Sequence, residues 1–228
     1  MIVDIQYSAG ANDWPALRDA VRRAEDEGYG TTWVLDHFDG AMVGGDRPML
    51  EAFTLLGALA ACTTRIGLGT LVANVNNRRP ALLGLAASSV QRISGGRMIL
   101  GIGAGSAPGT KWAREHDERG IALHPTMAGR HLELISQIPV LRAATDAPII
   151  VGAASIELAA IAGERADGVN VRMTHPKIED IVDAARQAAG DRPFDLSAWA
   201  FLDDPGAHER AEELGLDRLI LVDLGPLA

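Results

Sequence analysis

Short apolar runs alternate along the whole chain with longer segments in which apolar residues recur every three or four positions. Runs of the first kind are typical of buried strands, and the second spacing predicts amphipathic helices. Strands are expected over residues 2–6, 31–35, 66–72, 98–102, 147–152, 167–171, 194–202 and 218–223. Helices are expected over residues 14–27, 50–62, 80–93, 126–143, 155–163, 176–190 and 205–215.

Capping residues support the limits of several of these helices. Asp13 can accept a hydrogen bond from the first turn of a helix, and Pro80 suits a first helical position. Gly28 and the Gly95–Gly96 pair can adopt the backbone conformation that ends a helix. The first and third helices are therefore expected to begin and end at these residues.

The order of the elements predicts the fold class. Eight expected strands alternate with seven expected helices, the pattern of a parallel sheet covered by helices. Eight strands close a (β/α)8 TIM barrel, and 228 residues is near the lower end of the usual length. We predict an α/β TIM barrel that forms one domain over residues 1–228, with an open doubly wound sheet as the alternative.

No helix is expected after residues 218–223, so the predicted barrel lacks its last helix. A gap in the outer ring exposes the first and last strands unless something covers it. The tail of the chain, the first helix and another subunit are the three candidates.

The loops that follow the strands are the expected place for a ligand, since parallel α/β folds bind ligands at the carboxyl ends of their strands. Residues 73–79 and 103–109 follow the third and fourth strands. Residues 106–125 show no clear periodicity, and loops of this length are usually lids or binding loops. Trp112 favours an ordered loop.

Asp36 and His37 stand at the carboxyl end of the second strand, inside the predicted mouth of the barrel. A histidine there can act as a general base, donate a hydrogen bond to a cofactor ring, or simply anchor the loop. The spacing of His116, His124 and His131 is too irregular for a metal site, so no metal is expected.

Two segments contain small residues where a cofactor could approach the backbone. The glycines between residues 101 and 105 do not have dinucleotide-fingerprint spacing. They can let a flat ring lie against the backbone, or they can pack near the barrel axis. Residues 152–155 lead into a helix N-terminus, whose free N–H groups favour an anion such as phosphate.

Charge and composition limit the classes of partner that we expect for this chain. The formal net charge of −9 and the pI near 5.1 argue against nucleic acid or an anionic membrane as the main partner. No apolar run reaches the length of a membrane span, and the first residues read as a strand rather than a signal peptide, so a cytoplasmic protein is expected. Cys62, the one cysteine, lies in an apolar helix and is expected to be a buried small residue.

Several motifs in combination resemble the bacterial-luciferase-like superfamily. They are Asp36-His37-Phe38 after the second strand, LGTLV at 68–72 with Arg78 and Pro80, and SGGR at 94–97 followed by LGIGAG at 100–105. Segments within residues 120–130, 150–152 and 163–168 also fit, and the resemblance covers roughly residues 1–172.

The resemblance implies a TIM barrel that binds a flavin or the deazaflavin coenzyme F420. The motifs are most similar to those of the F420-dependent oxidoreductases, in which the counterpart of His37 faces the deazaflavin ring and acts as a base. Asp36 would tune or orient this histidine. Leu71 and Val72 would form a bulge, often with a non-prolyl cis peptide, behind the ring.

The same resemblance implies further contacts. Asn74 and Ser106 are expected to hydrogen-bond the ring or the substrate. The remaining expected cofactor contacts are Gly103 and Gly105 beside the ring, and Gly152, Ala153, Ala154, Ser155 and Ile156 around the phosphate. The helices over residues 50–62 and 80–93 would form a homodimer interface.

The chain also departs from the family pattern. Ser106 stands where the sugar-phosphate dehydrogenase branch has a catalytic glutamate, and the segments around residues 143–147 and in the C-terminal third are short. The leading hypothesis is an oxidoreductase that moves a hydride between F420 and a small organic substrate. An FMN-dependent luciferase-like monooxygenase and a non-catalytic flavin-binding protein are the alternatives.

Overall fold

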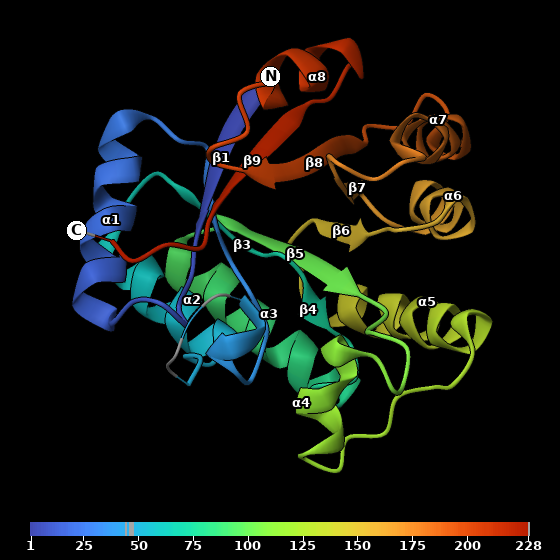
Figure 1. The fold of residues 1–228 in the computed structure, drawn as a ribbon, viewed down its shortest axis with the longest axis horizontal. Coiled ribbons are helices and arrows are strands. Elements are labelled where there is room, and N and C mark those ends of the chain that lie inside the picture. Colours follow the sequence, from blue (N-terminus) through green and yellow to red (C-terminus); the bar gives the residue numbers. More distant parts are fainter. Residues whose placement is uncertain (44, 46–47, 228) are drawn as a thin grey trace.

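The apolar runs form parallel strands that close into a barrel (Figure 1). The structure is a computed structural model, and it describes residues 1–43, 45 and 48–227. The strands are β1 Ile2–Tyr7, β2 Thr31–Val34, β3 Gly67–Thr70, β4 Ala73–Asn74, β5 Met98–Gly103, β6 Ile149–Gly152, β7 Gly168–Arg172, β8 Asp195–Phe201 and β9 Arg218–Asp223.

Closure depends on the pairing of the first and last strands. β1 pairs with β9 in parallel, from Ile2 opposite Arg218 to Tyr7 opposite Asp223. The strands otherwise follow their chain order around the sheet, and β3 also pairs with β5. The predicted TIM barrel is confirmed, and the open-sheet alternative is wrong.

The third barrel strand is divided into β3 and β4. A cis peptide bond joins Leu71 to Val72 between the two halves, as the resemblance implied. Both halves pair in parallel with β5, so the interruption leaves the barrel closed.

Helices surround the barrel where the periodicity predicted them. They are α1 Trp14–Glu27, α2 Ala52–Cys62, α3 Pro80–Ser94, α5 Met127–Ala144, α6 Ile156–Arg165, α7 Ile178–Ala189 and α8 Ala207–Glu213. Asp13 caps α1 by accepting from Ala16 N at 3.1 Å, and Gly28 and Gly95 end α1 and α3 with φ of 89° and 70°. Within the described residues, no helix is both long and apolar enough to cross a membrane.

The segment after β5 differs from the expectation of an irregular loop. It contains a 3-10 turn, η2 Lys111–Ala113, and a short helix, α4 Arg114–Asp117. This segment buries Glu115 and His116 against the barrel mouth, at 1% and 2% exposure. A second 3-10 turn, η1 Gly40–Val43, follows β2.

The tail after β9 partly covers the gap that the sequence predicted. No helix follows β9 among the residues described, and the chain passes back toward α1 (Figure 1). Asn12 holds this tail by accepting from Leu227 N at 2.7 Å and donating to Gly225 O at 3.0 Å. The tail therefore packs against the loop between β1 and α1.

A buried charge network fills the amino-terminal end of the barrel. The carboxylate of Asp4 accepts from Arg218 at 2.7 Å and from the indole N–H of Trp33 at 2.8 Å. Arg218 also donates to Asp195 at 3.2 Å. Because this end is closed by side chains, a ligand site belongs to the opposite mouth, as in other parallel barrels.

Candidate active site

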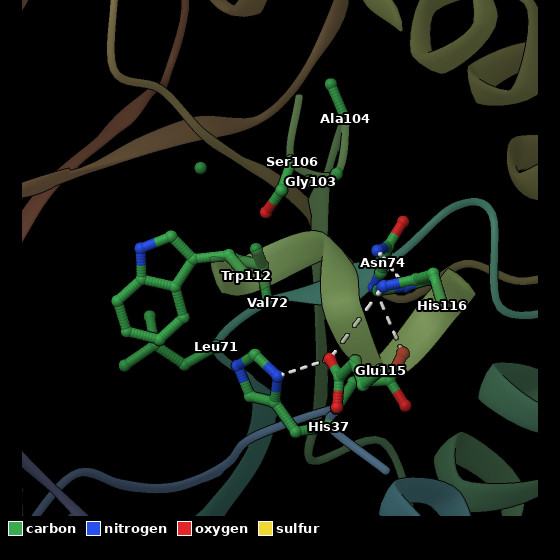
Figure 2. Close-up of a pocket in the computed structure, with 13 residues that line it drawn as sticks. His37, Leu71, Val72, Asn74, Gly103, Ala104, Ser106, Trp112, Glu115 and His116 are labelled. Carbon is green, nitrogen blue, oxygen red and sulfur yellow. Dashed lines mark hydrogen bonds and ion pairs between the residues drawn. The ribbon is translucent and has the colours of Figure 1, made fainter. Parts of the chain in front are cut away.

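A cavity of about 280 Å³ opens at the carboxyl ends of β2, β4, β5 and β6 (Figure 2). Its walls come from the ends of these strands and from the segment that holds η2 and α4. The lining residues are Asp36, His37, Leu71, Val72, Asn74, Gly103, Ala104, Gly105, Ser106, Trp112, Glu115, His116 and Gly152. The barrel thus brings together nine of the site residues predicted from the sequence: Asp36, His37, Leu71, Val72, Asn74, Gly103, Gly105, Ser106 and Gly152.

His37 projects into this cavity from the chain just after β2. Its Nδ1 lies 2.6 Å from Oε1 of Glu115, and its ring has no other hydrogen bond to a described residue. Because a carboxylate only accepts, Nδ1 carries a proton and Nε2 is the free nitrogen. In Figure 2 the edge of the ring away from Glu115 is turned toward Leu71 and Trp112.

Glu115 is a buried carboxylate that joins α4 to the end of β2. Its second oxygen accepts from the backbone N–H groups of Phe38 and Asp39, at 2.8 and 3.3 Å. Burial alone raises the pKa of Glu115, but the hydrogen bonds from His37 and the two backbone groups outweigh burial and hold this pKa below its usual value. Glu115 is therefore an ionised hydrogen-bond acceptor that fixes the orientation of the His37 ring.

Asp36 lines the cavity as expected, but its carboxylate contacts residues other than His37. Its carboxylate makes a two-point ion pair with Arg78, at 2.8 Å for both oxygens, and accepts from Asn74 N at 3.0 Å and Asn77 Nδ2 at 3.1 Å. These contacts hold the loop after β4 and do not involve His37. Within the described residues Glu115, rather than Asp36, orients the histidine.

His116 is the second buried group that α4 adds to the cavity. Its Nε2 lies 2.8 Å from both Asn74 Nδ2 and Asn77 Oδ1, and its Nδ1 lies 4.0 Å from Glu115 Oε1. Burial lowers the pKa of His116, which favours the neutral ring. The Asn74 amide, expected to contact a ring or substrate, therefore already has protein partners.

Gly103 at the end of β5 and Gly105 just after it make room for other parts of the site. A Cβ at Gly103 would lie 2.6 Å from Cγ2 of Val72, and a Cβ at Gly105 would lie 2.8 Å from Asn76 Nδ2. Gly105 also has φ of 74°, where a side chain is strained. Gly103 therefore makes room for the Val72 side chain, and the backbone of Gly103 and Gly105 also lines the cavity, where a flat ring could lie against it.

The predicted phosphate site lies at the start of α6. Ser155 is the N-cap and accepts from Leu158 N at 3.2 Å, and Gly152 lines the cavity. Ala153, Ala154, Ser155 and Ile156 lie outside the lining. The pKa of Glu157 is lowered mainly because its carboxylate accepts hydrogen bonds from its own N–H and from Ser155. Glu157 therefore places a negative charge in the first turn of α6, close to where the phosphate is expected.

A second cavity of about 390 Å³ adjoins the first. It is mostly apolar, and it shares His37, Leu71 and Trp112 with the first cavity. Its other lining residues are Leu35, Val43, Lys111, Arg172, Trp199, Phe201, Val222 and Leu224. His37 therefore lies between a polar cavity and an apolar one.

The sequence did not single out Glu115 as a site residue. It lies in a charged stretch, Arg114–Arg119, that resembles a solvated loop. Its contact with His37 joins residues 78 positions apart in the chain. The only sequence signal is its place in the long segment after the fourth barrel strand, where such folds bind ligands.

Comparison with known proteins gives a family match and several similar enzymes. A family profile described as luciferase-like monooxygenase matches residues 3–124. The chain is 29% identical over 208 residues to a 5,10-methylenetetrahydromethanopterin reductase of Methanolobus tindarius, covering 82% of this chain and 61% of the relative. It is 29% identical over 192 residues to an F420-dependent glucose-6-phosphate dehydrogenase of Amycolatopsis mediterranei, covering 73% and 56%.

Solved structures share the fold. An F420-dependent secondary alcohol dehydrogenase in complex with an F420–acetone adduct superposes with a TM-score of 0.77 at 16% identity, covering 99% of this chain and 94% of that chain. The coenzyme F420 dependent tetrahydromethanopterin reductase of Methanopyrus kandleri gives 0.63 at 20% identity, covering 90% and 68%. The chain spans about three fifths of the length of the curated reductases it matches.

Proposed function

This chain belongs to the luciferase-like monooxygenase family, and we propose that it is an F420-dependent oxidoreductase acting on a small organic substrate. The observation that carries the proposal is His37, which is held by a buried carboxylate where a polar and an apolar cavity meet. The names of the glucose-6-phosphate dehydrogenase relative and of the alcohol dehydrogenase structure support F420 as the cofactor.

The residues of the polar cavity suit a flat heterocycle. The Leu71–Val72 peptide forms one wall, and the chain from Gly103 to Ser106 offers backbone groups and a hydroxyl. The Ser106 side chain has no hydrogen-bond partner among the described residues, so it is free to contact a ring. When bound, F420 supplies the hydride chemistry.

His37 would exchange the proton that accompanies hydride transfer. Its Nδ1–H donates to Glu115, so Nε2 is the atom that can take a proton from an alcohol or give one to a carbonyl. The apolar walls around Leu71 and Trp112 would exclude water from this nitrogen.

The cofactor phosphate is expected to bind at the start of α6. Gly152, Ala153, Ala154, Ser155 and Ile156 would hold the cofactor phosphate through backbone N–H groups. Glu157 lies in the first turn, so its carboxylate would have to turn away from this end of the helix when an anion binds.

A homodimer through α2 and α3 is part of the proposal. α3 carries three large exposed apolar side chains, Leu82, Leu85 and Ile93, at 56%, 62% and 58% exposure. A groove of about 440 Å³ runs between this face and α2. An exposed apolar patch of this kind is typical of a protein interface.

Cofactor titration tests the proposed function. Purified protein is titrated with F420 and, in parallel, with FMN, and tryptophan fluorescence is followed, since Trp112 lines the cavity. We expect tight binding of F420 and weak binding of FMN, followed by bleaching of bound F420 when a panel of alcohols is added. Preference for FMN with oxygen consumption would indicate a monooxygenase, tight binding without turnover would indicate a binding protein, and binding of neither would overturn the proposal.

A further inference from the structure

The apolar cavity beside His37 suits one class of substrate. We propose that it binds a planar, largely apolar carboxylate, such as an aromatic or conjugated acid, with the carboxylate at Arg172 and the ring between Trp112 and Trp199. The reaction at this site rests on the proposed function, but the binding of the acid can be tested without the cofactor.

Aromatic side chains are concentrated in this cavity. Trp112, Trp199 and Phe201 are three of the ten Phe, Trp and Tyr residues in the chain. Trp199 and Phe201 meet edge to face at 5.6 Å between ring centroids. Trp112 and Phe201 remain 41% and 38% exposed, so a ligand would cover apolar surface that water now contacts. Such walls favour a flat, apolar molecule.

Two cations that line this cavity, Lys111 and Arg172, are exposed and have no acidic partner among the described residues. The guanidinium of Arg172 lies over the ring of Trp199 at 5.3 Å, and the ammonium of Lys111 lies over Trp112 at 4.5 Å. Neither forms an ion pair with any residue that the structure describes. By contrast, Arg78 and Arg218 each pair with two carboxylates.

The acidic residues of the neighbouring polar cavity already have cationic or histidine partners. None of the residues lining the apolar cavity is aspartate or glutamate. In the neighbouring cavity, Glu115 accepts from His37 and Asp36 accepts from Arg78. In a chain with net charge −9, two cations that have no ion pair within the described part of the chain, beside an apolar wall, favour an anionic ligand.

The same lining argues against a sugar-like substrate. The polar side chains of the apolar cavity are His37, Lys111, Arg172 and the indole N–H groups, so hydroxyl groups of a sugar would have few partners. A volume of about 390 Å³ is within the usual range for small-molecule sites. A substituted ring that carries a carboxylate would contact the apolar walls with its ring and the two cations with its carboxylate.

Calorimetric titration with trans-cinnamate, and with the uncharged trans-cinnamamide, tests the inference. Arg172→Met keeps an apolar stem over Trp199 but removes the positive charge. Arg172→Lys retains the positive charge. Arg23→Met is the matched control, because Arg23 is exposed on α1, away from the cavity. Thermal unfolding of each variant checks that the fold is kept.

We expect wild type to bind cinnamate more tightly than the amide. Arg172→Met should weaken cinnamate binding about 10- to 100-fold, the usual size of a lost charge-assisted contact, and leave the amide unchanged. Arg172→Lys should recover part of the loss, and Arg23→Met should bind as wild type does. Equal affinity for acid and amide, or equal affinity of wild type and Arg172→Met for the acid, would overturn the inference.

The F420 titration on the same samples separates this inference from the proposed function. Binding of F420 without selective binding of cinnamate would leave the oxidoreductase proposal intact and overturn the substrate class. Selective binding of cinnamate without binding of F420 would support the carboxylate site and overturn the proposed function.

Discussion

At the scale of single residues, the site depends on how one histidine is held. His37 donates Nδ1–H to Glu115. Glu115 in turn accepts from the backbone N–H groups of Phe38 and Asp39, which directly follow His37. The carboxylate and the histidine therefore position each other. This leaves one imidazole nitrogen, Nε2, to face the cavities.

Replacing His37 with alanine removes the nitrogen that would exchange the proton. Turnover should fall about 10²- to 10⁴-fold, the usual contribution of a general acid or base, while F420 affinity changes little. Stopped-flow measurement of F420 reduction, together with fluorescence titration, separates the two effects. His208→Ala on the exposed α8 is the control, and unchanged turnover in His37→Ala would contradict the assigned role.

Replacing Glu115 with glutamine removes a buried charge that accepts three hydrogen bonds. We expect a loss of about 1–3 kcal/mol in the free energy of unfolding at neutral pH. The folded pKa of Glu115 lies below its ordinary value of 4.5, so its stabilisation is present above that pH and is lost as pH falls through the lowered pKa. Urea unfolding at several pH values should show the two proteins converging in acid, and a constant difference would contradict this prediction.

At the scale of elements, the barrel mouth is built by segments that pack tightly around the interrupted third strand. β3 and β4 flank the Leu71–Val72 peptide, and β5 lies beside both halves. Val72 fills the space that a side chain at Gly103 would take. The shape of the polar cavity therefore depends on a glycine in the neighbouring strand.

Gly103→Ala should displace Val72 and the bulge. A Cβ at 2.6 Å from Val72 Cγ2 overpacks the site, so we expect about 1–3 kcal/mol lower stability and clearly weaker F420 binding. Gly206→Ala is the control, since a Cβ there meets its nearest atom only at 3.7 Å. The measurements are urea unfolding and fluorescence titration, and an alanine variant with wild-type values in both would refute the packing role.

The exposed face of α3 tests the proposed dimer. Leu85→Arg places a charge on a side chain that is 62% exposed in one chain and would be covered in the dimer. Light scattering after gel filtration should show a dimer for wild type and a monomer for the variant. Leu132→Arg, on the equally exposed face of α5, should leave the dimer intact, and the same mass for wild type and Leu85→Arg would contradict the interface.

At the scale of the whole molecule, the two ends of the barrel contain different kinds of groups. The amino-terminal end holds the buried network of Asp4, Arg218, Asp195 and Trp33. The carboxyl end holds the two cavities. A change at the amino-terminal end is therefore expected to alter stability without altering the cavities.

Arg218→Met should destabilise the protein without altering the site. Asp4 is fully buried, and loss of its cationic partner leaves an uncompensated charge, which costs about 3–5 kcal/mol. The double variant Asp4→Asn, Arg218→Met should recover part of this loss, because both charges are then removed. Urea unfolding measures both, and an equal loss in the single and double variants would contradict the argument.

Most of the fold could be predicted from the sequence, because its signals are local. Helices begin and end where capping residues and periodicity place them, as at Asp13 and Gly28. The alternation of strands and helices limits the chain to a parallel sheet, and the number of strands favours a closed barrel. Family motifs also pointed to His37 and to the Leu71–Val72 peptide.

The partners within the site were decided by the tertiary structure alone. His37 and Glu115 are 78 residues apart, and nothing in the local pattern of the charged segment says that its glutamate is buried. Asp36 pairs with Arg78 only because the loop after β4 lies against the residues that follow β2. Side chains from distant segments meet through barrel closure and loop packing, which depend on the whole chain. The sequence by itself therefore determined the barrel and pointed to the histidine. The tertiary structure decided which carboxylate orients this histidine and which cations have no ion pair among the described residues.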